Sequence, residues 1–248
     1  SPSKRSNWRR QVHRFTRNRM AFTGLVLVVV LILTALLAPV IAPYPEDAFG
    51  AVHAQDALLP PSPAHLFGTD DLGGDVFSRV VFGARYSLAI GIAIVALAFL
   101  IGVPVGAIAG FAGGFVNELI MRIAVWWPGF CRLTQGQVLA LREQTYVEAA
   151  RVVGAGQGRI IFRHILPNTL TALIVKVSMD IGFAILTAAG LSFIGIGAQP
   201  PVPEWGAMVN TGRQFMPDWW WYATFPGLAI FLAVFGFNML GDGVRDAL

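Results

Sequence analysis

Charged residues are scarce in this sequence. They make up 13% of its 248 residues, against about 25% in ordinary soluble domains. Hydrophobic residues account for 55%, and long stretches carry no charge at all. Such a composition excludes an ordinary soluble domain and is typical of a protein that crosses the bilayer several times.

Reactive and metal-binding groups are also few. The one cysteine, Cys131, excludes an intrachain disulfide and a metal site built from several cysteines. Residues 154–158 are rich in glycine, but no stretch matches the G-x-x-x-x-G-K-[ST] phosphate loop, so we do not expect this chain to bind ATP. No Ser/His/Asp arrangement stands out, and the four histidines lack metal-ligand spacing: His13, His53, His65 and His164. We therefore expect no catalytic residue, metal or cofactor in this chain.

Four apolar stretches are long enough to cross a hydrocarbon core of about 30 Å, and they cover residues 21–42, 87–111, 169–195 and 222–241. The second combines small residues, which allow close helix packing, with one proline that can kink a helix: Gly102, Pro104, Gly106 and Gly110. We predict an all-α, polytopic transmembrane helix bundle. Its parts are a cytoplasmic amphipathic segment (1–20), a first span (21–42), an external loop subdomain (43–86) and a core (87–248).

The distribution of charge predicts the orientation of the chain. Seven of the 18 Lys and Arg residues lie within residues 4–19, which contain no acid. Residues 43–86 carry six acids and two basic residues, whereas basic residues outnumber acids within 132–163. By the positive-inside rule, both termini and a loop at 132–167 are cytoplasmic and residues 43–86 are external.

The N-terminal region allows two other interpretations. Trp8 and Phe15 lie among its basic residues, as they would in an arm that binds nucleic acid. An amphipathic helix on the cytoplasmic leaflet is favoured, because the basic run directly precedes a span. A signal peptide is not expected, since the apolar run after Met20 is too long and ends in Ala-Pro.

Residues 114–132 do not fit the pattern of spans. They are largely apolar but too few for a span of about 20 residues. The loop charges on either side allow zero or two further crossings here, and two would need roughly 40 more residues. The protein therefore either has four spans or lacks a hairpin near residues 125–126.

The most informative motif lies in the predicted cytoplasmic loop. It consists of Glu148-Ala149-Ala150, then Gly154, then Leu166-Pro167. Residues 146–153 are predicted to form a short helix that ends at Gly154, and Pro167 is predicted to start the next membrane helix. Such a helix is either a docking element or an ordinary amphipathic connector, and the spacing alone favours the connector.

This motif resembles the EAA loop of ABC importer permeases, whose coupling helix sits in a cleft of the ATPase subunit. His164 stands where that family has an isoleucine. Within the family, the chain is similar to the second permease of the dipeptide, oligopeptide and nickel group. The segments that carry this resemblance are residues 67–79, 163–168, 191–195, 199–206 and 238–246. Gly74 departs from it, because relatives have arginine there.

The resemblance implies a type I ABC importer permease of the bacterial inner membrane, with six spans. Glu148 would be the anchor of the coupling helix and Gly154 its turn. The implied partners are a second homologous permease, two ATPase subunits that bind ATP and Mg²⁺, and an extracytoplasmic substrate-binding protein. Together the permeases would import di- or oligopeptides, with nickel chelates, glutathione or opine-like compounds as alternatives. A secondary transporter without ATPases is the alternative of another class, but no inverted repeat is visible.

Three further groups of residues attract attention. Lys176 and Asp180, four apart in the third span, either neutralise each other or line a pathway. The external loop contains Asp70, Asp71, Asp75 and Arg79, which the resemblance places facing the binding protein. These acids do not follow the order of a calcium-binding loop, and capping of a helix near Val76 is favoured over metal binding.

Trp205 and the aromatic run 219–222 are predicted to anchor the protein at the membrane interface, rather than to bind peptide.

Overall fold

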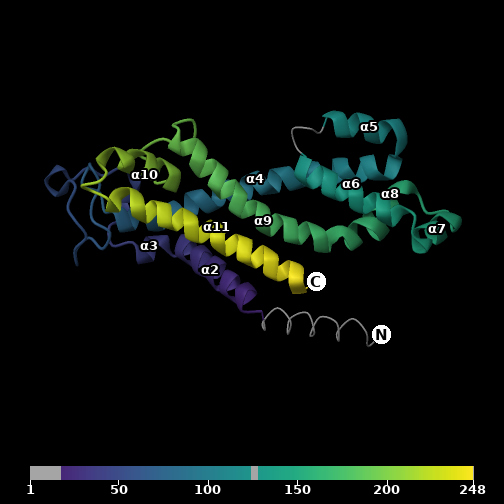
Figure 1. Cartoon of the computed structure of the whole chain (residues 1–248), viewed down its shortest axis with the longest axis horizontal. Helices are drawn as coiled ribbons and strands as arrows, with labels where there is room; N and C mark the ends of the chain where they lie inside the picture. Colours follow the sequence, from purple (N-terminus) through teal and green to yellow (C-terminus); the bar gives the residue numbers. More distant parts are fainter. Residues whose placement is uncertain (1–17, 124–127, 248) are drawn as a thin grey trace.

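The computed structural model describes residues 18–123 and 128–247, and this part of the chain is a bundle of helices (Figure 1). Its long helices are α2 (Arg19–Leu36), α4 (Val76–Ala112), α9 (Leu166–Phe193) and α11 (Trp221–Ala247). Within the described ranges, the only β-type pairing is an isolated bridge between Thr69 and Asp75. The predicted all-α membrane bundle is therefore confirmed.

Shorter helices connect the long ones. They are α3 (Ala38–Ile41), η1 (Pro45–Phe49), η2 (Ala54–Asp56), α5 (Gly114–Ile123), α6 (Pro128–Arg142), α7 (Thr145–Val152), α8 (Gln157–Arg159), η4 (Ile160–Ile165), α10 (Trp205–Gly212) and η5 (Arg213–Phe215). Residues 43–75 and α10 gather at one end of the bundle, which we call the external-loop end (Figure 1). The opposite end, with α5, α7 and α8, is the coupling-loop end.

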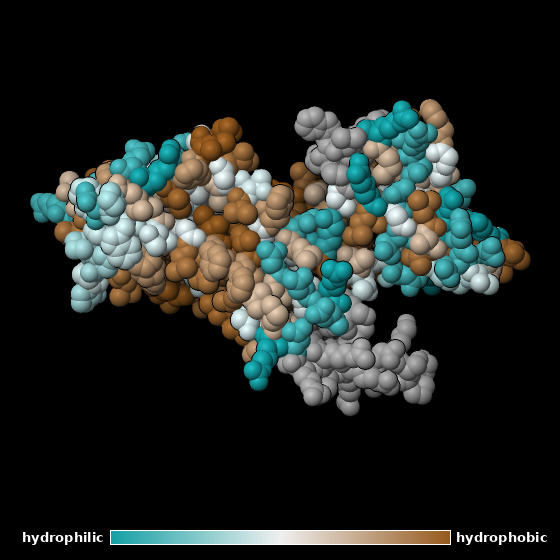
Figure 2. Space-filling model, viewed as in Figure 1, coloured by the Kyte–Doolittle hydropathy of each residue, from teal (hydrophilic) through white to brown (hydrophobic). Residues whose placement is uncertain are grey.

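The long helices form the apolar middle of the molecule. Helix α11 packs against α2 and α9, while α4 packs against α6 and α9. Figure 2 shows hydrophobic residues gathered where α2, α9 and α11 lie, and hydrophilic residues prevailing at the coupling-loop end. On α2, large apolar side chains such as Val30 and Leu36 are more than half exposed, as expected for a surface that faces lipid.

Four helices of the described part are long and apolar enough to cross a membrane. Helices α5 and α6 have 10 and 15 residues, so neither reaches the length of about 20 that a span needs. The predicted junction of a missing hairpin, at residues 125–126, lies outside the described residues. The resemblance implies six spans, but only four of the described helices are long and apolar enough to be spans.

Small residues bring the first and last spans together. Asn18 caps α2 by accepting hydrogen bonds from the N–H groups of Met20 and Ala21, and its Nδ2 donates to Asp246 Oδ2 at 3.3 Å. A Cβ atom on Gly243 would lie 2.2 Å from the Cβ of Ala21. The start of α2 and the end of α11 are therefore at the same level of the bundle.

A row of glycines on α4 receives α6. Added Cβ atoms would meet the backbone or side chains of α6 at 2.8 Å for Gly102, 2.3 Å for Gly106 and 2.7 Å for Gly110. The prediction that small residues of the second span allow close helix packing is confirmed. Helix α4 continues through Pro104 without a break.

Pro167 lies in the first turn of α9, as predicted, but the helical turns that lead into this span begin earlier in the chain. Helical turns begin at Gln157 and pass through the π-helical segment η4 into α9, so Pro167 lies inside a continuous helical stretch, Gln157–Phe193. Proline lacks an N–H group, and its ring clashes with the carbonyl four residues earlier in an α-helix. The wider π turn before Pro167, in which the Leu166 N–H donates to Ile161 O, relieves this conflict.

The predicted interface role is wrong for three aromatic residues. Trp205, Trp221 and Tyr222 are only 1%, 6% and 2% exposed and belong to the core of the external-loop end. The indole of Trp205 donates to Val80 O at 2.9 Å, and that of Trp221 donates to Thr69 O at 3.2 Å. Because the protein itself satisfies these polar groups, the side chains do not need the membrane–water interface. Trp220 does stay exposed.

Two alanine substitutions test the packing of α4 against α6. Gly106→Ala should destabilise the protein by about 1–3 kcal/mol, because the new methyl group overpacks the contact with Cys131. Gly136→Ala on α6, where nothing lies within 4 Å, should instead stabilise it by about 0.5–1 kcal/mol through helix propensity. Thermal unfolding in detergent measures both, and changes of equal sign would contradict this packing.

Candidate functional site

The loop of residues 43–75, which the charge distribution predicts to be external, is tied together by carboxylates. Asp75 caps α4: its Oδ2 accepts hydrogen bonds from the N–H and hydroxyl groups of Ser78, both at 2.7 Å. Its backbone N–H donates to Asp47 Oδ2 at 2.7 Å, and its Oδ1 lies 3.0 Å from His65 Nδ1. The predicted capping of the helix near Val76 is therefore confirmed for Asp75.

The other predicted residues of this loop lie in the same network. Asp70 Oδ1 accepts hydrogen bonds from the N–H groups of Leu72 and Gly74, and its Oδ2 forms an ion pair with Arg79. Asp71 accepts a hydrogen bond from the hydroxyl group of Tyr222 at 2.8 Å. Residues 18–123 and 128–247 contain no cluster of three or more His, Cys, Asp or Glu side chains arranged to hold a metal ion.

The Asp70–Arg79 ion pair is buried. Asp70 is 0% exposed and Arg79 is 7% exposed. Burial raises the pKa of Asp70 above its ordinary value, and the neighbouring guanidinium of Arg79 opposes that rise. The pair joins the loop to the first turns of α4, so the loop cannot move without breaking it.

At the opposite end, helix α7 is anchored by one face only. Val147 and Ala150 are buried and pack in one cluster with Ile160 and Ile165, which lead into α9. Glu148 and Ala149 are exposed on the other face. Helix α7 is therefore fixed to the base of α9 and presents the remaining side of the Glu-Ala-Ala motif to its surroundings.

A left-handed turn ends α7. Gly154 has a φ of +79°. The N–H of Gly154 donates to Arg151 O, and the N–H of Ala155 donates to Ala150 O. These two bonds form a Schellman motif, and the prediction that Gly154 caps the helix is confirmed.

Apolar side chains are exposed beside this turn. Val152 is 87% exposed, Val153 is 82% exposed and Phe162 is 68% exposed. Exposed apolar surface is typical of sites of contact with another protein or with the membrane. Leu166 and Pro167 are the last residues of the predicted coupling motif. They begin α9, which directly follows η4, the segment that contains Phe162.

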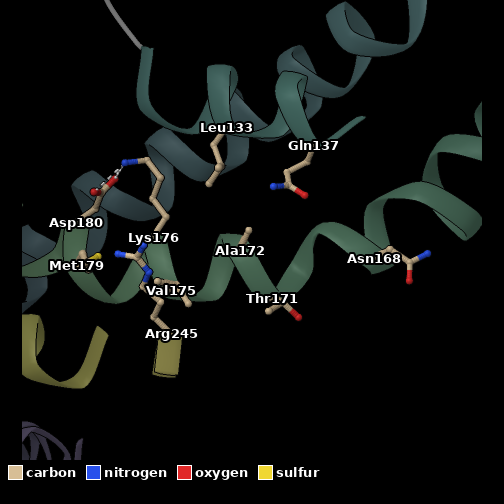
Figure 3. A pocket seen from close by; sticks show the side chains of 10 residues that line it. All are labelled: Leu133, Gln137, Asn168, Thr171, Ala172, Val175, Lys176, Met179, Asp180 and Arg245. Carbon is tan, nitrogen blue, oxygen red and sulfur yellow. Dashed lines mark hydrogen bonds and ion pairs between the residues drawn. The ribbon is translucent and has the colours of Figure 1, made fainter. Parts of the chain in front are cut away.

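The third predicted group lines a cavity. Lys176 Nζ lies 3.0 Å from Asp180 Oδ2, and it also lies 5.3 Å from the centre of the Phe130 ring. The cavity has a volume of about 580 Å³ and lies between α6, α9 and the end of α11 (Figure 3). Lys176 and Asp180 do pair, which is one of the two alternatives that the sequence left open, and both also line a space large enough for a small solute.

Polar residues that the sequence did not single out share this cavity. They are Gln137 on α6, Asn168 and Thr171 on α9, and Arg245 near the end of α11. The α9 residues recur at intervals of three and four, so helical periodicity could have revealed that face. No signal in the sequence points to Gln137 or Arg245, because their proximity to α9 depends on the packing of the bundle.

Comparison with known proteins gives two family matches. Residues 73–248 match the model of the binding-protein-dependent transport system inner membrane component. Residues 6–61 match the N-terminal TM domain of oligopeptide transport permease C.

Individual relatives agree with these matches. The chain is 39% identical to a dipeptide transport system permease protein of Alkalihalophilus pseudofirmus, over 98% of this chain and 90% of the relative. It is 41% identical to a probable D,D-dipeptide transport system permease protein of Escherichia coli, over 92% of this chain and 87% of the relative. It is also 41% identical to a glutathione transport system permease protein of Pectobacterium atrosepticum, over 99% and 92%. The first of these alignments runs over 275 positions, more than the 248 residues of this chain, so that relative contains residues that this chain lacks.

Removal of Arg79 tests the buried ion pair. Arg79→Met leaves the carboxylate of Asp70 buried without its counter-ion and should destabilise the protein by about 3–5 kcal/mol at neutral pH. Because the pKa of Asp70 is raised in the folded state, protonation favours folding, so the variant should regain stability at acidic pH and lose it as pH rises. Thermal unfolding in detergent at both pH values measures this, with the exposed Arg85→Met as control. An equal loss at both pH values would contradict this account.

Proposed function

The chain belongs to the family of binding-protein-dependent transport system inner membrane components, and from this premise we propose how its two ends serve transport. It is a permease subunit of an ATP-driven importer, and not an enzyme. The single observation that carries the proposal concerns helix α7. One of its faces is packed against the residues that lead into α9, and apolar groups are exposed at its C-terminal end.

The transported solute is a di- or oligopeptide in this proposal. Relatives named for dipeptide transport support it, as does the match of residues 6–61 to an oligopeptide permease domain. Glutathione, which a further relative is named for, is itself a peptide. Nickel chelates and opine-like compounds are alternatives within the same class of importer.

Four further subunits complete the importer in this proposal. A second homologous permease supplies the other half of the path, and an extracytoplasmic binding protein delivers the solute to the external-loop end, where Asp70, Asp71, Asp75 and Arg79 lie. Two ATPase subunits bind ATP and Mg²⁺, since the sequence has no phosphate loop of its own. They dock on the exposed side of α7, around Glu148, Ala149, Val152 and Val153.

Transport is coupled to ATP through the packing beneath α7. Closure of the ATPase dimer moves α7, and the buried contacts of Val147 and Ala150 with Ile160 and Ile165 pass this motion to α9. Because side chains in such a cluster are closely packed, a shift of α7 cannot be absorbed locally. Helix α9 then changes position within the bundle, and the path alternates between the two sides of the membrane.

The orientation of the chain in the inner membrane can be tested by labelling. Cysteines introduced at Asp56 and Arg151, both exposed, should react differently with a membrane-impermeant thiol reagent in intact cells. Asp56→Cys should be labelled from outside, and Arg151→Cys only after the membrane is permeabilised, because the basic end faces the cytoplasm. The native Cys131 is 2% exposed and should contribute little background. Labelling of Arg151→Cys in intact cells would reverse the orientation.

Two substitutions test the coupling role of α7. Glu148→Lys reverses a charge on the docking face, where unfavourable charge contacts cost several kcal/mol. Gly154→Val places a β-branched residue at a φ of +79°, which costs about 1–2 kcal/mol. Both variants should insert into the membrane but lose substrate-stimulated ATP hydrolysis when reconstituted with the partner subunits.

The matched control is Gly156→Val. Gly156 lies two residues further on, with a φ of −63° and nothing within 4 Å of an added Cβ. It should keep its stimulation. If Glu148→Lys and Gly154→Val also hydrolysed ATP with normal stimulation, α7 would be an ordinary connector.

A further inference from the structure

We infer that the cavity between α6, α9 and α11 is a subsite for the carboxylate of the transported solute, with Lys176 as its main ligand. The inference rests on the function proposed above and specifies which chemical group the permease itself recognises. It starts from the charges around the cavity. Lys176 and Arg245 are cationic, and Asp180 is the one carboxylate among the lining residues. The cavity therefore has an excess of positive charge and attracts an anion.

Lys176 is placed to exchange partners. Its side chain is 27% exposed, and its pairing with Asp180 is between residues four apart on one helix. An ammonium group has three donors, so it can bind a second carboxylate without a change in the backbone. The Phe130 ring, 5.3 Å away and itself 3% exposed, forms a fixed wall beside the ammonium. Asp180 serves as the resting counter-ion when no solute is bound.

The rest of the lining suits the remainder of a peptide. Figure 3 shows Lys176 reaching from α9 toward α6, while Gln137 points from α6 toward α9. Leu133, Ala172, Val175 and Met179 supply apolar surface on both helices. Sites for small molecules typically enclose about 300–1,000 Å³ and combine an apolar lining with few polar groups, and the volume here is about 580 Å³.

The position of the cavity fits the inner mouth of the path. Arg245 lies near the end of α11, which is level with the start of α2 through the bond between Asn18 and Asp246. Lys176 lies about 15 Å along α9 from Leu166, at a rise of 1.5 Å per residue. The first turns of α9 thus continue beyond the end of α11 toward the coupling-loop end (Figure 1). Charges at the end of a span cost less than charges at the bilayer centre.

A purely structural ion pair would not need these surroundings. The pair of Glu118 and Arg122 on α5 has the same spacing of four residues, but its side chains are 59% and 76% exposed and it does not line this cavity. The pair of Lys176 and Asp180 has the same spacing, but it lines a cavity of about 580 Å³ together with a second cation, Arg245. The structure therefore offers a matched control within one chain.

The test compares uptake of trialanine with uptake of its C-terminal amide. Proteoliposomes would contain the complete importer, and both peptides would be supplied at concentrations that saturate the binding protein. The wild type should take up the acid faster than the amide by about tenfold, the effect expected of one charge-assisted hydrogen bond. Lys176→Met should bring this ratio close to one, because the amide loses nothing when the ammonium is removed.

Further variants make the result decisive. Asp180→Asn should keep or increase the preference for the acid, since Lys176 then has no competing partner, and Arg122→Met should leave the ratio unchanged. If Lys176→Met fails to assemble, Lys176→Gln replaces it, with the same expected ratio. An unchanged ratio in the Lys176 variant, with ATP-driven uptake intact, would overturn the subsite alone. Absence of any ATP-driven uptake by the wild type would overturn the proposed function and the subsite with it.

Discussion

A polypeptide in lipid has to satisfy its backbone hydrogen bonds within the protein, and the rest of this structure depends on that constraint. The spans are therefore helices. Because the surrounding lipid is itself apolar, the hydrophobic effect does not drive these helices together, and close van der Waals packing holds them instead. Gly106 of α4 and Gly243 of α11 lie so near their neighbours that no side chain would fit. These contacts fix α4 against α6 and α11 against α2, and the polar groups gather at the two ends of the bundle.

The two ends are built for different tasks. At the external-loop end, the ion pair of Asp70 and Arg79 is buried, and the carboxylates of Asp47, Asp71 and Asp75 also have partners within the chain. At the coupling-loop end, α7 is buried on one side and leaves Val152 and Val153 exposed. These two kinds of end are what the proposed roles require, with the binding protein docking at one end and the ATPase subunits at the other.

Local rules predicted much of this from the sequence. Hydrophobic length located the four spans, the preference of glycine for positive φ located the end of α7 at Gly154, and helix capping accounted for Asp75. Features that depend on tertiary packing were missed or wrong. Trp205 is an interface residue by its type, but α4 provides a carbonyl partner for its indole. The π turn before Pro167 and the approach of Arg245 to Lys176 depend on how helices meet, which spacing in one segment does not encode.

The central claim is that this bundle is the membrane path of an importer driven by ATP. Its most direct test is uptake of a labelled dipeptide into proteoliposomes that contain this chain, a second permease, the ATPases and the binding protein, without any ion gradient. The account predicts that uptake requires ATP and the binding protein together and stops when this chain is omitted. Uptake that an ion gradient drives in the absence of ATP, or that persists without this chain, would contradict it.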